Sequence, residues 1–155
     1  MTVAKGISNE GIQAFLSDSR VPFDGVFSSD LIPNSIWEKK SYVFVVNTSP
    51  SILSWGHFVT VMKTGQTCFF IDPLAMNLYE SFTKFDPQCR LVTLSKPIQS
   101  TTSHSCGYYA ILFILYHFHQ PPFKLQFYNG YDNDKLLKND ELCLKYIKKS
   151  LVFSN

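Results

Sequence analysis

The chain has few cysteines and little net charge, two features by which several classes of protein are recognised. It carries four cysteines in 155 residues, at positions 68, 89, 106 and 143, with neither a Cys-x-x-Cys pair nor the dense framework of a small secreted domain. Its formal net charge of +2 is too small to argue by itself for nucleic-acid or membrane binding. It has no repeat, linker or low-complexity segment. These absences favour one domain over residues 1–155, in a reducing compartment.

Long apolar stretches are missing as well. Residues 1–10 lack the apolar core of a signal peptide, and no apolar segment reaches membrane-spanning length without interruption. We therefore expect an intracellular monomer without membrane contact. Aromatic side chains are in excess, with 14 Phe and eight Tyr, and we expect them in the core or along an extended binding groove.

The two ends of the chain have apolar residues at helical spacing, and the region between them has patterns typical of strands. Residues 8–18 have apolar positions at helical spacing behind a Ser8 or Asn9 cap, and the leucines from 136 onward repeat this spacing. Residues 20–34, with two prolines and a glycine, predict an anchored loop. Strands are predicted at 41–46, from 55 or 57 to 62, at 67–71 and at 90–94. The predicted fold class is α+β, a twisted mixed sheet flanked by helices.

A cysteine opens the longest apolar run. From Cys106 to His119 the residues are too many and too uniformly apolar for a short strand, and Pro121-Pro122 stops the run. We predict a central buried helix with Cys106 in its first turn. The free amide protons and the positive dipole end there favour a thiolate, and hence a nucleophile. Considered alone, such a cysteine is more often inert core.

A base for this thiol follows from a predicted hairpin. The strands at 57–62 and 67–71 are joined by a short connection with a glycine, which favours antiparallel pairing. His57 opens the first strand and Asp72 closes the second, so imidazole and carboxylate meet at one edge of the sheet. Cys106, His57 and Asp72 fit the roles of nucleophile, base and orienting acid. Each residue also has an interpretation without catalysis. His57 could be a strand histidine that is hydrogen-bonded to a backbone carbonyl, and Asp72 could be a turn residue before Pro73.

Attack of a thiol on a carbonyl group also needs donors for the oxyanion that forms. The amide protons around Cys106 are candidates, and so is the side chain of Gln99, seven residues earlier in the preceding loop. The alternative for Gln99 is a solvated loop residue. His104 lacks further ligands at metal-site spacing, so we expect a loop residue and no metal site. His117 and His119 fit the negative end of the helix dipole.

The order of these residues resembles that of a known peptidase family. Trp55-Gly-His57-Phe58, Phe70-Ile-Asp72-Pro73, and Gln99 with six residues before Cys106-Gly107 are similar to motifs of the adenovirus-type cysteine proteases, the adenains. They are similar more remotely to those of the ubiquitin-like-protein proteases. The similarity covers roughly residues 20 to 119.

The resemblance implies a cysteine protease that matures viral precursor proteins at Gly-containing sites, with Cys106, His57, Asp72 and Gln99 in the catalytic roles. The chain departs from adenains at Asp72, where Glu is usual, and at Phe58, where Trp is usual. It is also shorter after the central helix.

Partners follow from the resemblance alone. Adenains are activated by a viral peptide and by DNA, so both are expected beside polypeptide substrates, while no cofactor follows from the sequence itself. Cys89 falls close to the cysteine with which adenain bonds its activating peptide, which implies such a disulfide here. The resemblance also implies the host nucleus and the virion as locations.

Other functions stay open. Deconjugation of a ubiquitin-like modifier uses the same chemistry, although those proteases favour Asp where this chain has Ser105. Acyl transfer from coenzyme A occurs on a related frame, but the chain shows no clear phosphate-binding cluster. A non-catalytic scaffold or DNA-binding relative would use the basic residues of the last helix, which otherwise form a solvated face. These residues are Lys138, Lys145, Lys148 and Lys149.

Overall fold

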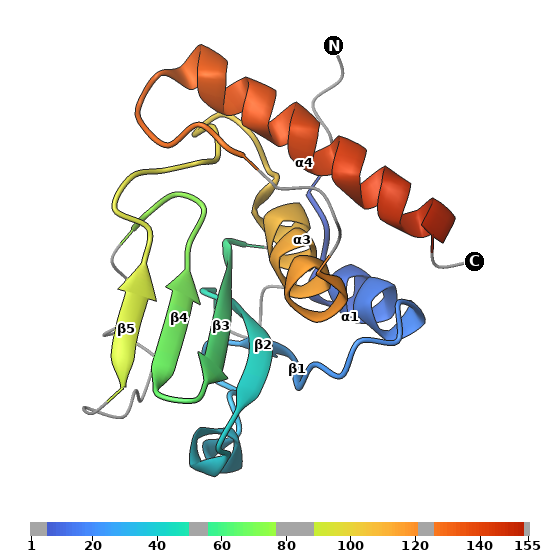
Figure 1. The fold of residues 1–155 in the computed structure, drawn as a ribbon, viewed down its shortest axis with the longest axis vertical. Helices are drawn as coiled ribbons and strands as arrows, with labels where there is room; N and C mark the ends of the chain where they lie inside the picture. Colours follow the sequence, from blue (N-terminus) through green and yellow to red (C-terminus); the bar gives the residue numbers. More distant parts are fainter. Residues whose placement is uncertain (1–5, 50–55, 77–88, 121–125, 154–155) are drawn as a thin grey trace.

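The computed structural model describes residues 6–49, 56–76, 89–120 and 126–153, with backbone alone for 150–153. Its strands lie in chain order across one five-stranded sheet (Figure 1). The strands are β1 Gly25–Ser28, β2 Tyr42–Asn47, β3 Phe58–Thr64, β4 Thr67–Ile71 and β5 Arg90–Thr93. The helices are α1 Asn9–Asp18, the 3₁₀ helix η1 Asn34–Glu38, α3 Cys106–His119 and α4 Asn133–Phe153. The predicted α+β class is confirmed.

The sheet is mixed, with a central antiparallel part and a parallel pair at each edge. β2 pairs with β3 and β3 with β4 in antiparallel fashion, whereas β1 runs parallel to β2 and β5 parallel to β4. The predicted hairpin is confirmed, since Thr64 lies opposite Thr67 and Gly65 takes the left-handed conformation (φ 59°) in the turn between them. This hairpin carries the edge of the sheet where the candidate site lies.

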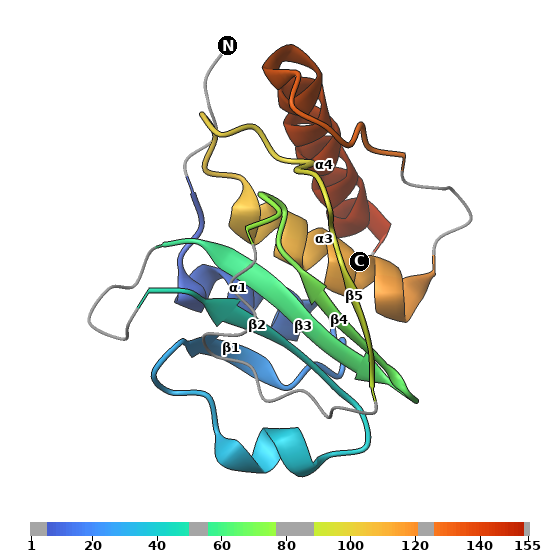
Figure 2. The ribbon, with the colours of Figure 1, turned by 90° about the vertical axis from the view of Figure 1, so that its left-hand side faces the viewer.

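Both faces of the sheet are covered, which explains the continuous apolar run of β2. α1 and α3 lie on one face, with α4 on the far side of α3, and η1 lies on the other face (Figures 1 and 2). Val43 and Val45 point into the core shared with the three α-helices, and Phe44 and Val46 point into the second core. A strand buried on both faces needs apolar residues at every position, so it loses the polar alternation of a surface strand.

The second core is built from aromatic rings around Phe44, which is fully buried. Phe27 and Trp37 meet its ring edge to face, with centroids at 5.8 and 5.5 Å, and Tyr42 lies at 5.6 Å. These contacts place part of the aromatic excess in the core, as expected.

The segment predicted as a loop at 20–34 differs from the prediction. It contains β1, and it is followed by η1, which was not predicted either. β1 is stabilised by its pairing with β2, for example of Gly25 with Phe44. Because β1 has only four residues and its partner lies in another segment, its own sequence pattern does not predict a strand. Gly25 has φ 142°, and a Cβ there would lie 2.8 Å from the ring of Phe27, so only glycine fits easily.

The predicted boundaries of the central helix agree with the structure. α3 begins at Cys106 and ends at His119, followed by Gln120 in the left-handed conformation, whose N–H donates to the Tyr116 carbonyl. Pro121-Pro122, predicted as the stop, and Trp55, the alternative strand start, lie outside the described residues. At the other end, the hydroxyl of Ser8 accepts from the Gly11 amide and caps α1, as predicted.

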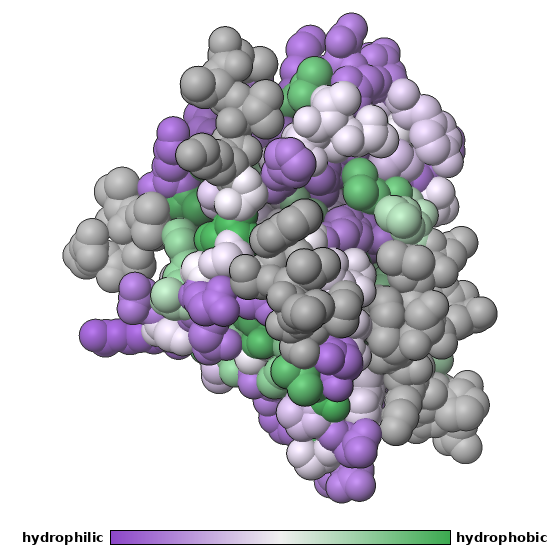
Figure 3. All heavy atoms as spheres, turned by 180° about the vertical axis from the view of Figure 1, so that it is seen from behind, coloured by the Kyte–Doolittle hydropathy of each residue, from purple (hydrophilic) through white to green (hydrophobic). Residues whose placement is uncertain are grey.

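The surface mixes hydrophilic and apolar side chains. On the face shown in Figure 3, hydrophilic residues surround smaller apolar areas. Large exposed apolar side chains belong to separate segments, which is ordinary for a folded domain; they are Leu31, Met76, Leu91 and Tyr131. Within the described ranges, no helix combines the length and the hydrophobicity needed to cross a membrane.

Candidate active site

His57 and Asp72 meet at the edge of the sheet where β3 begins and β4 ends. His57 Nε2 lies 2.6 Å from Oδ1 of Asp72, a residue 15 positions later in the sequence. The hairpin alone produces this contact, because antiparallel pairing brings the start of one strand beside the end of the next. The predicted neighbourhood of imidazole and carboxylate is therefore present.

The carboxylate of Asp72 is buried and fixed by the turn that follows it. The Leu74 amide donates to Oδ1 at 2.9 Å and the Met76 amide donates to Oδ2 at 3.1 Å. Asp72 thus has both expected features: it is the residue that stabilises the turn before Leu74, and it faces His57. These bonds hold the carboxylate in one orientation before any substrate binds.

Cys106 lies where the last loop enters α3. Ser105 precedes the helix without a side-chain capping bond, so this hydroxyl does not occupy the amide protons of the first turn. The Cys106 thiol donates to the Gly56 carbonyl at 3.6 Å and also contacts the neighbouring His57 ring. The sulfur is thus nearly buried and lies beside an imidazole at the N-terminal end of a helix.

Gly107 allows this helix start to approach the sheet. A Cβ at Gly107 would lie 2.4 Å from Cγ2 of Ile7 and 3.3 Å from the ring of Phe58. A larger residue at this position would therefore require the side chain of Ile7 to move. The Cys-Gly pair of the sequence therefore has a packing reason beside any catalytic one.

The charge on His57 is set by its two partners. Burial lowers the pKa of His57, but hydrogen bonds and charge interactions with Asp72 and Cys106 outweigh it and raise the pKa to about 9. These two partners therefore favour the protonated form of the ring. Since Nε2 faces Asp72, Nδ1 is the ring nitrogen left for the sulfur. The arrangement can hold an imidazolium between a carboxylate and a thiolate.

Gln99 lies in the loop that leads to α3. Its side chain is only 2% exposed, so the alternative of a solvated loop residue is wrong. Nε2 donates to the Ser103 carbonyl at 3.2 Å, and its backbone N–H donates to the carbonyl of Pro73, the residue after Asp72. The structure thus joins Cys106, His57 and Asp72 directly, and holds Gln99 in the adjoining loop with one amide proton bonded to Ser103.

Cys89 requires a correction. It forms a disulfide with Cys68, with Cα atoms 6.0 Å apart. The parallel pairing of β4 with β5 places Leu91 opposite Cys68, which brings Cys89 within reach. The prediction of a disulfide between Cys89 and an activating peptide is therefore wrong for this structure, because Cys68 already holds the sulfur. The disulfide also does not fit the cysteine pattern that indicated a reducing compartment.

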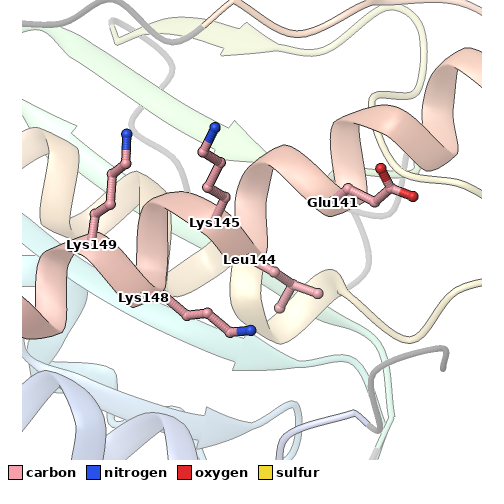
Figure 4. Close-up of a pocket in the computed structure, with 5 residues that line it drawn as sticks. All are labelled: Glu141, Leu144, Lys145, Lys148 and Lys149. Atoms are coloured by element: carbon pink, nitrogen blue, oxygen red, sulfur yellow. The ribbon is translucent and has the colours of Figure 1, made fainter. Parts of the chain in front are cut away.

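The remaining candidate residues lie apart from this site. His104 is exposed in the loop before α3, and among the described residues no three His, Cys, Asp or Glu side chains gather as a metal site requires. Lysines of α4 line a surface hollow, in which Lys145 and Lys149 extend to one side and Lys148 to another (Figure 4). The residues of this hollow are Glu141, Leu144, Lys145, Lys148 and Lys149.

Sequence reasoning missed polar residues that support the site. Asn139 and Asp140 of α4 are buried, although the sequence around them looks like a solvated face. A signal existed, because they fall between Leu136 and Cys143 on the stripe of α4 that faces α3. A polar pair on an apolar stripe indicates buried partners.

Comparison with known proteins gives no family. The chain matches no protein-family model, and none of the curated proteins searched matches it significantly. The case for a function therefore rests on the residues and their geometry.

Proposed function

We propose that this protein is a cysteine endopeptidase with Cys106 as its nucleophile. One observation carries the proposal: Asp72 holds the His57 ring at 2.6 Å, while the Cys106 thiol contacts that ring from the start of a buried helix. A nucleophile, a base and a group that orients the base are the three parts of thiol-dependent acyl transfer.

Acylation begins with the proton of Cys106 on His57. The thiolate attacks the carbonyl carbon of the substrate, a C–S bond forms, and the carbonyl oxygen takes the negative charge. When the C–N bond breaks, the His57 imidazolium gives its proton to the leaving amine. Asp72 stabilises the imidazolium and fixes the ring so that the second nitrogen faces the sulfur.

Deacylation reverses these roles. His57, now neutral, takes a proton from a water molecule, and the resulting hydroxide attacks the thioester carbon. The C–S bond breaks and the carboxylic acid product leaves. Cys106 returns as a thiolate beside the protonated ring, so the resting pair is restored with one water consumed.

Two donors fit the oxyanion. The Cys106 amide lies at the helix start, and the Gln99 amide has a second N–H beyond the one bonded to Ser103. Removal of a single oxyanion donor costs about 2.7–4 kcal/mol of transition-state stabilisation in a serine protease. We therefore expect Gln99 to contribute on that scale once a substrate carbonyl is bound.

The substrate class rests on the motif resemblance and on the enclosed position of the sulfur. Cys106 is 7% exposed, so a substrate with small residues next to the cleaved bond reaches it most easily. The motif resemblance adds viral precursor proteins cleaved at Gly-containing sites as substrates, virions and the host nucleus as locations, and an activating peptide and DNA as partners.

The test is incubation of the protein with a panel of Gly-containing peptides, with Cys106→Ala as the control. We expect turnover by the wild type alone, and covalent labelling of Cys106 by a peptide with a thiol-reactive group. No turnover combined with no labelling would refute the proposal. Labelling only by a ubiquitin-like modifier with a C-terminal electrophile would instead favour deconjugation, which needs the body of the modifier for docking.

A further inference from the structure

The face of α4 that packs against α3 carries two adjacent polar side chains. Asn139 and Asp140 are each only 5% exposed. Burial of a polar side chain is unfavourable unless it is hydrogen-bonded, so their partners show what these residues do.

Asn139 joins two loops through three hydrogen bonds. Its Nδ2 donates to the Ile98 carbonyl at 2.8 Å and to the Tyr128 carbonyl at 2.6 Å, and its Oδ1 accepts from the Tyr128 amide at 2.9 Å. The first of these bonds ends on the residue directly before Gln99. α4 therefore reaches the backbone of the loop that carries the proposed oxyanion donor.

Tyr109 places a hydroxyl between the same carbonyl and Asp140, and its single proton can serve only one of the two acceptors at a time. Its hydroxyl, on α3, lies 3.2 Å from the Ile98 oxygen and 2.8 Å from Oδ1 of Asp140. Burial raises the pKa of Asp140, while hydrogen bonds from Ser103, Tyr109 and the Ser100 amide act against it. Asp140 of α4 thus also lies against the loop beyond Gln99.

The backbone amides of the same segment are bound by the turn that follows Asp72. The amides of Ile98 and Gln99 both donate to the Pro73 carbonyl, at 2.9 and 3.1 Å. The backbone at Gln99 is therefore fixed between the turn that holds Asp72 and the side chain of Asn139. A displacement of either partner would move the Gln99 amide relative to Cys106.

We propose that Asn139 is a positioning residue for catalysis, which acts through the Ile98 carbonyl to place the Gln99 side chain. The inference rests on the proposed function, and it assigns to α4 a role in the oxyanion site. Asn139 has no contact with substrate in this role. Its removal loosens the loop but leaves Cys106 and His57 in place, because Cys106 is held by the packing of α3 at Gly107 and His57 by its bond to Asp72.

The test separates the oxyanion step from thiolate reactivity. In Asn139→Ala we expect kcat for a Gly-containing peptide to fall by about 10- to 100-fold, since a partly misplaced donor loses part of its effect. KM and the rate of Cys106 alkylation by iodoacetamide, which forms no oxyanion, should stay within about twofold of the wild type. Asp134→Ala, at an exposed position on the same helix, is the matched control.

A double-mutant cycle decides the route. If Asn139 acts through Gln99, then Asn139→Ala lowers kcat much less in a Gln99→Ala background than in the wild type. Tyr109→Phe, which removes the hydroxyl between Ile98 and Asp140, serves as the second variant if Asn139→Ala does not fold, and we expect the same pattern at smaller size. Hydrogen exchange in the 98–103 loop should rise in both variants.

The outcomes are distinguishable. Full kcat in Asn139→Ala, equal losses of kcat and alkylation, or additive effects with Gln99→Ala would each overturn the inference while the proposed function stands. Absence of hydrolysis by the wild type would overturn the proposed function, and this inference with it.

Discussion

Replacement of Asp72 by Asn tests the electrostatics of the site most directly. Asparagine has the size of aspartate but no charge, and it offers one acceptor oxygen in place of two. The Leu74 and Met76 amides then compete for that oxygen, and the His57 ring loses its anionic partner. Two effects follow, one on the titration of His57 and one on stability.

The titration effect has a sign and a size. The pKa of His57 is raised from 6.5 to about 9, which corresponds to about 3 kcal/mol in favour of the imidazolium in the folded protein. A raised pKa contributes stability that is fully present below pH 6.5 and is lost as the pH rises through about 9. Without Asp72, burial opposes the charge with less compensation, so the pKa of His57 must fall.

The assay is the pH profile of kcat/KM. For the wild type we expect the basic limb near pH 9, where His57 loses the proton that the leaving amine needs. For Asp72→Asn we expect this limb to move down by at least about one pH unit, and the maximum rate to fall by about 10²–10⁴-fold. Asp18→Asn, an exposed carboxylate at the end of α1, is the control and should change neither.

Stability must be measured beside activity. A loss of about 1–3 kcal/mol in unfolding free energy is expected for Asp72→Asn, because one partly buried amide of the turn loses its acceptor. A basic limb that stays near pH 9 in a folded Asp72→Asn protein would refute the assignment of Asp72 as the group that holds the proton on His57.

Three further changes test the packing. Gly107→Ala should lower the unfolding free energy by about 1–3 kcal/mol, because the new Cβ meets Ile7 at 2.4 Å; unchanged denaturant melting would contradict this contact. Serine at both Cys68 and Cys89 should cost about 3 kcal/mol, the value for a loop closed across 21 residues, and a reductant should have no further effect on that variant. Phe44→Ala should cost about 3–5 kcal/mol, with Phe44→Leu costing less; equal costs would argue against the ring contacts described above.

Local patterns were sufficient for most elements of the fold. The helix at 106–119 was predictable because its apolar residues form one long run, and the hairpin because a glycine stands between two strand-like runs. β1 was not predictable, since its four residues acquire strand geometry only through pairing with β2. The strand order across the sheet was likewise invisible, because hydrophobic periodicity records which face is buried and not which strand lies beside it.

The candidate site divides in the same way. The contact of His57 with Asp72 was predictable from the hairpin, because antiparallel pairing brings the two strand ends together. Cys106 was predictable as a candidate nucleophile because it lies at the start of a helix. The burial of Gln99 and the disulfide of Cys68 with Cys89 did not follow, because each depends on a loop or strand that crosses from elsewhere in the chain.

The sequence by itself therefore determined which residues have the chemistry for thiol catalysis, and it placed two of them together through local structure. Tertiary structure alone decided how the sulfur meets the imidazole, because Cys106 reaches His57 across 49 residues of sequence, through the packing of α3 on the sheet. It also decided that Asn139 is buried. The reason is physical: hydrogen bonds within a turn or a hairpin are set by neighbouring residues, whereas contacts between distant segments are set by the packing of the whole core.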